Sequence, residues 1–140
     1  EYDPCDVQKA RELKAVSEDG SYNKSEFEDI SSIVAGITGH KGRVHLRFGT
    51  PIDRSFDTPE AVAAEIDRQV LSGYHLFPSH HLALEALGSH PELVDLSEVS
   101  EADRDRFAQR LSEVPEDLRS WWLAQYANPV INCARSEPSS

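Results

Sequence analysis

Hydrophobic residues along most of this chain recur every three or four positions, which is the spacing of one face of an α-helix. Helix-start signals such as the capping box Ser25-x-x-Glu28 precede several of these stretches, and glycines follow them. The pattern predicts helices over residues 4–16, 25–38, 59–72, 80–87, 101–114 and 115–128. The last helix is expected to end where Asn128 precedes Pro129, because the residue before a proline avoids helical backbone angles.

The same stripes predict which residues form the core. The expected buried positions are Ile30, Ile33, Val34 and Ile37; Val62, Ile66 and Val70; Phe107 and Leu111; and Leu118, Trp121, Trp122, Leu123 and Tyr126. The last set is rich in aromatic side chains, which either pack in a core or face a lipid chain or bilayer interface. Core packing is the favoured interpretation, because an acidic chain is poorly attracted to an anionic membrane.

Residues 42–49 have a different period. Val44, Leu46 and Phe48 alternate with Arg43, His45 and Arg47, which is typical of a strand with one apolar and one basic face; this segment alone carries that pattern clearly. Residues 74–77 form a second, shorter extended candidate before Pro78. Because a lone strand needs a neighbour, its hydrogen-bond partners are expected to lie upstream of this chain.

These elements predict a mixed α/β fold, dominated by helices and with few strands. The length of 140 residues fits one domain. Within it the sequence divides into a helical pair (1–37), a strand-turn-helix unit (38–87), a helical extension (88–135) and a tail (136–140). The absence of methionine indicates that the sequence is a piece of a longer protein, and no stretch is apolar enough to span a bilayer.

The formal net charge of −11 argues against general nucleic-acid binding. Residues 38–54 are the exception, with a net charge of +3, and they contain the predicted strand. Lys41, Arg43 and Arg47, with His40 and His45, therefore form a candidate site for an anionic phosphate head group. The alternative is that these side chains neutralise carboxylates on neighbouring acidic helices.

The sequence gives weaker support for a catalytic pair or a metal site. His90 and Asp95 fit the spacing His-x-x-x-x-Asp of a general base and its orienting carboxylate, but their neighbours fit a helix start equally well. A metal site would draw on His75, His80, His81 and Glu85. Adjacent histidines point to different sides of a helix, so no metal ligand, catalytic residue or cofactor is predicted.

Several separated motifs occur in a recognisable order. They are Glu1 to Asp6 with Lys9 and Ala10, Gly36 to Gly49, Ala64 to Asp67, and Tyr126 to Val130. Read together, they resemble the C-terminal portion of a bacterial glycerolipid acyltransferase of the 1-acylglycerol-3-phosphate acyltransferase type. In that family the catalytic His-x-x-x-x-Asp motif lies upstream of the Tyr-Asp-Pro-Cys-Asp segment. The resemblance therefore implies that this chain carries none of the family's catalytic residues and is inactive alone.

The resemblance further implies the activity of the full-length enzyme, a membrane-associated transferase of phospholipid synthesis. It would move an acyl chain from acyl-CoA or acyl carrier protein to a lysophosphatidate-like glycerol phosphate, at the cytoplasmic face of the inner membrane. Membrane contact is expected through the upstream part, with this segment itself soluble. Lys41, Arg43 and Arg47 would border the acceptor phosphate. The alternative is a non-enzymatic acidic helical domain that binds a partner protein.

Overall fold

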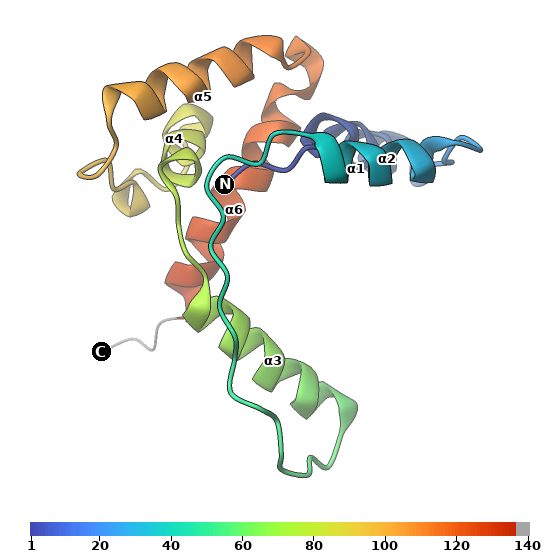
Figure 1. The fold of residues 1–140 in the computed structure, drawn as a ribbon, viewed down its shortest axis with the longest axis vertical. Helices are drawn as coiled ribbons and strands as arrows, with labels where there is room; N and C mark the ends of the chain where they lie inside the picture. The colour runs from blue at the N-terminus through green and yellow to red at the C-terminus, as the bar shows by residue number, and fades with distance from the viewer. Residues whose placement is uncertain (137–140) are drawn as a thin grey trace.

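The computed structural model describes residues 1–136, and within them every regular element is helical (Figure 1). The helices are α1 (Asp6–Asp19), α2 (Glu28–Thr38), α3 (Pro59–Gly73), α4 (Pro78–Leu87), α5 (Glu101–Glu113) and α6 (Arg119–Ser136), with short 3-10 helices η1 (Pro91–Leu93) and η2 (Glu116–Leu118). The described residues contain no strand, so the predicted mixed α/β class is wrong and the chain is all-α.

The segment predicted as a strand is extended but unpaired. Residues 42–49 pass the stretch between α3 and α4 and reach α3 only toward Gly49, without joining a ladder (Figure 1), and a strand is defined by backbone hydrogen bonds to a neighbour. Val44, Leu46 and Phe48, the apolar face of the predicted strand, are 74%, 75% and 86% exposed. The second candidate, residues 74–77, is likewise irregular. The predicted strands are therefore wrong, because alternation shows which residues share a face but does not supply the second strand that a ladder needs.

Local chemistry explains most helix ends. The Thr58 hydroxyl accepts from the Ala61 backbone N–H at 3.2 Å, and Ser100 forms a reciprocal capping box with Asp103. Gly88 ends α4 in the left-handed conformation, at φ 69°. Helix α4 begins earlier than predicted, with Pro78 as its first residue.

Helix α6 does not end at Asn128. It continues through Pro129 to Ser136, although proline removes the hydrogen bond that residue 129 would donate to the carbonyl of Gln125. Tyr126 and Val130, on either side of the proline, are buried. The free energy gained by burying these two turns outweighs the cost of the lost backbone hydrogen bond, so α6 continues past Pro129. Of the predicted tail, Ser136 is the last residue of α6 and residues 137–140 lie outside the described residues.

The core is built around α6. Helix α4 packs along α6, while α1 and α5 contact these two helices from the sides (Figure 1). Trp122 is fully buried, with its ring 5.6 Å from Phe107 and 4.7 Å from Tyr126, centroid to centroid. The expected core packing is therefore confirmed for Trp122 and Tyr126, and Trp121 is half-buried beside them.

No helix of the described residues is long and apolar enough to cross a membrane.

Two predicted helices form but do not bury their apolar stripes. Helix α2 lies against α1 through polar groups: the Ser32 hydroxyl donates to Gln8 Oε1 at 2.9 Å, and Gln8 Nε2 donates to Glu28 Oε1 at 2.9 Å. Its stripe of Ile30, Ile33, Val34 and Ile37 is exposed. Helix α3 likewise exposes Ile66 and Val70, so these residues are not the core that the spacing predicted.

Candidate functional site

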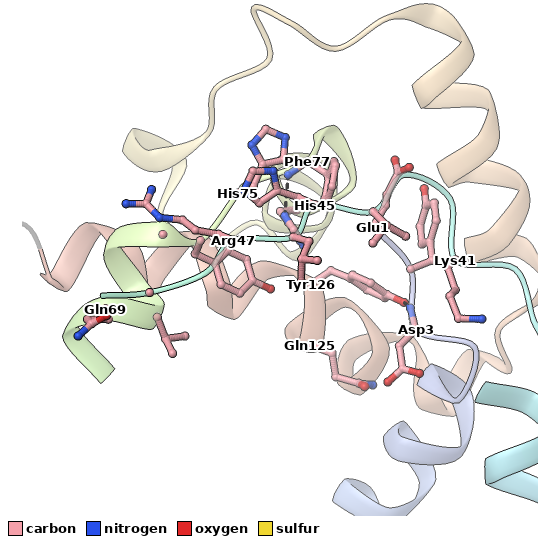
Figure 2. A pocket seen from close by; sticks show the side chains of 18 of the residues that line it. Glu1, Asp3, Lys41, His45, Arg47, Gln69, His75, Phe77, Gln125 and Tyr126 are labelled. Atoms are coloured by element: carbon pink, nitrogen blue, oxygen red, sulfur yellow. Dashed lines mark hydrogen bonds between the residues drawn. The ribbon is translucent and has the colours of Figure 1, made fainter. Parts of the chain in front are cut away.

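A cavity of about 840 Å³ lies where the N-terminal residues, the extended segment, α3 and α6 meet. Figure 2 shows its walls. The apolar wall consists of Val44, Leu46, Ile52, Ile66, Val70 and Tyr74. The polar lining consists of Lys41, His45, Arg47, Gln69, His75, His80, Gln125 and Tyr126 together with the carboxylates of Glu1 and Asp3. Because cationic side chains and histidine rings outnumber the two carboxylates, a cavity with this lining fits an amphiphilic, anionic ligand.

Three histidines lie along this cavity. The rings of His45 and His75 stack with centroids 4.7 Å apart, and the His75 ring meets Phe77 edge-on at 4.6 Å. Helix α4 positions the third, because His80 Nδ1 accepts the Phe77 backbone N–H at 2.8 Å. A nitrogen that accepts a hydrogen bond is unprotonated, so neutral His80 carries its proton on Nε2. That N–H has no partner among the described residues and is available to a ligand.

His80 is only 5% exposed, and burial lowers its pKa to about 4. In the unfolded chain its pKa returns to about 6.5, so the unfolded state binds more protons between these values. Folding stability is therefore fully present above about pH 6.5 and falls as the pH drops toward 4.

We expect the free energy of unfolding to fall by about 2 kcal/mol between pH 7 and pH 5 through His80 alone. Urea denaturation at the two pH values measures it. His80→Asn, whose side-chain oxygen can still accept from the Phe77 N–H, should lose this component, while His90→Asn at the surface should keep it. An unchanged pH dependence in His80→Asn would show that His80 titrates normally.

The three predicted basic residues do not form one patch. Lys41 Nζ donates to the carbonyl oxygens of Ile37 and Gly39 at 3.3 and 3.2 Å, where it closes the end of α2. Arg47 lines the cavity, lies against Gly73 and has no ion pair or hydrogen bond within residues 1–136. Of the three side chains, Arg47 is therefore the cation left available to an anion.

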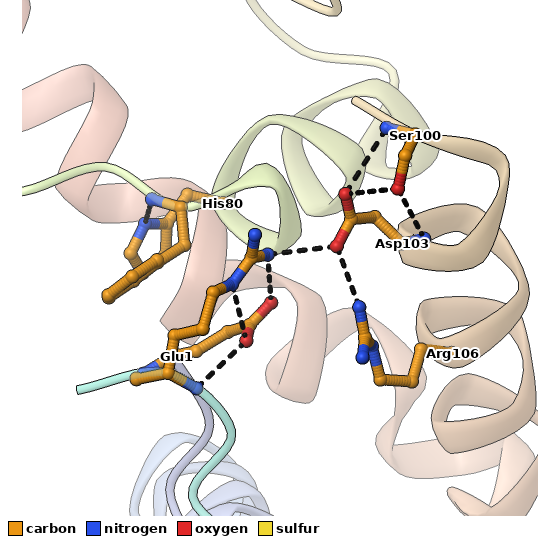
Figure 3. Close-up of polar contacts among 7 residues, drawn as sticks. Glu1, His80, Ser100, Asp103 and Arg106 are labelled. Atoms are coloured by element: carbon orange, nitrogen blue, oxygen red, sulfur yellow. Dashed lines mark hydrogen bonds and ion pairs between the residues drawn. The ribbon is translucent and has the colours of Figure 1, made fainter. Parts of the chain in front are cut away.

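Arg43 is neutralised by carboxylates, as the alternative interpretation expected. Its guanidinium donates to Glu1 at 3.1 and 2.8 Å and to Asp103 Oδ1 at 2.9 Å (Figure 3). The Ser100 hydroxyl and the Arg106 guanidinium also donate to Asp103, and these hydrogen bonds lower the pKa of Asp103. Arg43 thus ties the N-terminus to α5 and is removed from the candidate anion site.

The other candidates from the sequence are not assembled into sites. His90 Nδ1 lies 3.2 Å from Glu92 Oε1, whereas the Asp95 carboxylate accepts from the Ser97 backbone N–H at 3.0 Å. His90 and Asp95 are therefore not joined as base and orienting carboxylate. Among residues 1–136, no three His, Cys, Asp or Glu side chains lie close enough to hold a metal ion.

Sequence reasoning missed two features of this region. His80 was considered as a metal ligand, but its position two residues after Pro78 was the signal for a role at the helix start. The buried network of Asp6, Arg110 and Tyr126 had no such signal, since Asp6 in α1 lies 104 positions from Arg110 in α5 and 120 positions from Tyr126 in α6.

Comparisons of the chain with models of protein families, with curated proteins and with solved structures find no match in any of the three.

Proposed function

We propose that this chain is part of a glycerolipid acyltransferase and that its cavity borders the anionic acceptor. One observation carries the proposal: motifs of the resemblance that are far apart in sequence lie together in space. The Tyr2 backbone N–H donates to the Lys41 carbonyl at 2.9 Å, and the Tyr126 hydroxyl donates to Asp6 Oδ2 at 2.7 Å. Residues from the first, second and last motifs thus surround one edge of the cavity.

The glycines of the second motif have a physical role in this arrangement. A Cβ atom at Gly39 would lie 2.5 Å from Pro4 Cβ, and one at Gly42 would lie 2.6 Å from Glu1 Oε2. Gly42 also has a φ of 66°, in the region that side chains disfavour. The close approach of Pro4 therefore requires glycine at position 39, while at position 42 the positive φ favours glycine; the Gly39 contact supports reading the two motifs as one unit.

The cavity has the chemistry that a lysophosphatidate acceptor needs. Its apolar wall suits an acyl chain, while the Arg47 guanidinium and the His80 Nε2–H suit a phosphate. A volume of about 840 Å³ is within the usual range for ligand sites. In acyl transfer the acceptor hydroxyl attacks the thioester carbonyl and the thiol leaves; the role proposed for this chain is binding, with the base supplied elsewhere in the enzyme.

The chain should bind a short-chain lysophosphatidate, held below its micelle concentration, more tightly than the matching monoacylglycerol, which lacks the phosphate. Arg47→Gln should weaken lysophosphatidate binding about tenfold or more, because one charge-assisted hydrogen bond contributes about 1.5 to 3 kcal/mol. Titration calorimetry measures both ligands. Arg68→Gln is the matched control, since Arg68 pairs with Glu65 outside the cavity at 2.6 Å.

The enzymatic part of the proposal is tested on the full-length gene product, by transfer of a labelled acyl group from acyl-CoA to lysophosphatidate. Arg47→Gln should raise KM for lysophosphatidate more than it lowers kcat. Equal binding of the two ligands by the isolated chain, or an Arg47→Gln variant that behaves as wild type, would remove the acceptor site from the proposal. A full-length gene product that transfers no acyl group to lysophosphatidate would rule out the enzymatic part of the proposal.

A second candidate is the non-enzymatic interaction domain. The observation that favours it is the exposed apolar stripe of α2, formed by Ile30, Ile33, Val34 and Ile37. An exposed apolar stripe of this kind marks an interaction site. The two candidates separate in the acyl-transfer assay, because an interaction domain needs no lysophosphatidate and gives no product.

A further inference from the structure

The side chain of Arg47 lies across a glycine of α3. Gly73 is the last residue of this helix, and a Cβ atom added to it would stand 2.7 Å from Arg47 Cδ and 3.0 Å from Arg47 Nε. Because non-bonded heavy atoms settle about 3.5 to 4.0 Å apart, an alanine at position 73 would displace the Arg47 side chain from its present course. Both residues line the cavity.

The backbone does not account for a glycine at position 73. Among residues 1–136 the glycines with a positive φ are Gly20, Gly42 and Gly88, so the backbone of Gly73 is one that alanine adopts freely. Alanine is also the better residue in a helix, because glycine loses more conformational freedom there. What the missing side chain does provide at this position is the space that Arg47 occupies.

A second glycine joins the extended segment to α3 in the reverse arrangement. A Cβ atom at Gly49 would collide with Gln69 Oε1, and Gln69 Nε2 donates to Glu65 Oε1 at 2.9 Å, which holds the Gln69 side chain in place. The helix thus receives a side chain of the segment at Gly73, and the segment receives one of the helix at Gly49. Arg47 and Gln69 both lie at the α3 end of the cavity (Figure 2).

A carboxylate of the same helix is already occupied by other cations. Glu65 accepts from the Arg68 guanidinium at 3.0 and 2.6 Å and from Arg54 Nη2 at 3.3 Å. With these donors around it, Glu65 is not paired with Arg47, which has no ion pair within residues 1–136. The packing against Gly73 therefore sets the course of the Arg47 side chain without neutralising its charge.

We infer that Gly73 is a positioning residue for Arg47, and that the space above it lets the guanidinium lie along the cavity wall where it holds the phosphate of the acceptor. The inference rests on the proposed function, because a positioned guanidinium affects binding only if an anion binds beside it. Gly73 contacts no reacting atom, and its effect passes through Arg47. It therefore favours an anionic acceptor over a neutral one of the same shape.

Gly73→Ala should weaken binding of short-chain lysophosphatidate about two- to tenfold, the cost of forcing one side chain off its preferred rotamer. Binding of the matching monoacylglycerol should not change, since that ligand has no phosphate. The urea midpoint should stay the same or rise, because alanine suits the helix. Gly36→Ala is the matched control: Gly36 lies within α2, and a Cβ atom there meets nothing within 4 Å. Titration calorimetry and urea denaturation measure these effects.

The double variant Gly73→Ala with Arg47→Gln separates positioning from direct contact with the ligand. It should bind lysophosphatidate as Arg47→Gln alone does. A further loss in the double variant would show that the added methyl group meets the ligand itself, and it would overturn the inference. Wild-type binding by Gly73→Ala beside weak binding by Arg47→Gln would also overturn it, while leaving the acceptor site in place. Wild-type binding by Arg47→Gln would overturn both.

A readout without ligand tests the positioning alone. The NMR signal of the Arg47 side-chain Nε–H should shift in Gly73→Ala and stay unchanged in Gly36→Ala. An unchanged Arg47 signal in Gly73→Ala would overturn the inference whatever the chain binds. In the full-length gene product, Gly73→Ala should raise KM for lysophosphatidate more than it lowers kcat, and an equal fall in kcat without a change in KM would count against a positioning role.

Discussion

Replacing Trp122 with alanine is expected to lower the free energy of unfolding by about 3 to 5 kcal/mol, a large fraction of the roughly 5 to 15 kcal/mol by which a domain is stable. Trp122 is fully buried in α6, and its ring contacts Phe107 and Tyr126. Removing it leaves a cavity between α4, α5 and α6 that the surrounding helices can fill only in part. Thermal and urea denaturation followed by circular dichroism measure the loss.

Trp121→Ala is the matched control, because the same residue type stands one position earlier on the same helix but is only half-buried. Its expected loss is well below that of Trp122→Ala. Similar losses for the two variants would mean that α6 does not use the Trp122 face for its core, and the helix packing described above would then be wrong.

Asp6→Ala is expected to destabilise the fold by about 3 kcal/mol or more, because it removes the carboxylate from a partly buried ion pair. Asp6 Oδ2 accepts from Arg110 Nη2 at 2.9 Å and from the Tyr126 hydroxyl at 2.7 Å. Burial and the Asp6 carboxylate raise the pKa of Tyr126, so its hydroxyl remains protonated and donates. Without Asp6, the Arg110 guanidinium keeps its charge but loses its partner.

Two further single variants separate the parts of this network. Tyr126→Phe removes one hydrogen bond and should cost about 1 kcal/mol, while Asp6→Asn keeps the shape of the side chain and removes only its charge. Asp6→Asn should fall between the other two variants in urea denaturation. If Asp6→Ala and Tyr126→Phe were equally mild, the ion pair to Arg110 would contribute little and solvent would already screen it.

The sequence predicts the helices of this protein well and their burial poorly, for a physical reason. Helix ends depend on neighbouring residues, so Thr58, Ser100 and Gly88 could be assigned correctly from the chain alone. Whether the apolar face of a helix is buried depends on which other element packs against it. The stripe of Ile30 and Ile37 shows which side of α2 is apolar, but it does not show that α2 rests on α1 through its polar side.

The prediction of the candidate site from the sequence was incomplete, in part for the same reason. Alternation places Arg43 and Arg47 on one face of the extended segment, and it correctly separates them from Val44 and Leu46. It does not reveal that Asp103, sixty positions away, pairs with Arg43. Pro129 shows the converse, since a strong local signal to end α6 was overcome by the burial of Tyr126 and Val130.

The contact between Asp6 and Tyr126 joins residues 120 positions apart, and this has a consequence for the chain as it is made. Ribosomes add about 5 to 20 residues per second, so α1 leaves the ribosome roughly 6 to 24 seconds before the helix it packs on. During that interval Tyr2 and Ala10 have no α6 to bury them, and the apolar stripe of α2 is exposed beside them. The nascent chain is therefore a natural client for chaperones that hold apolar segments until synthesis is complete.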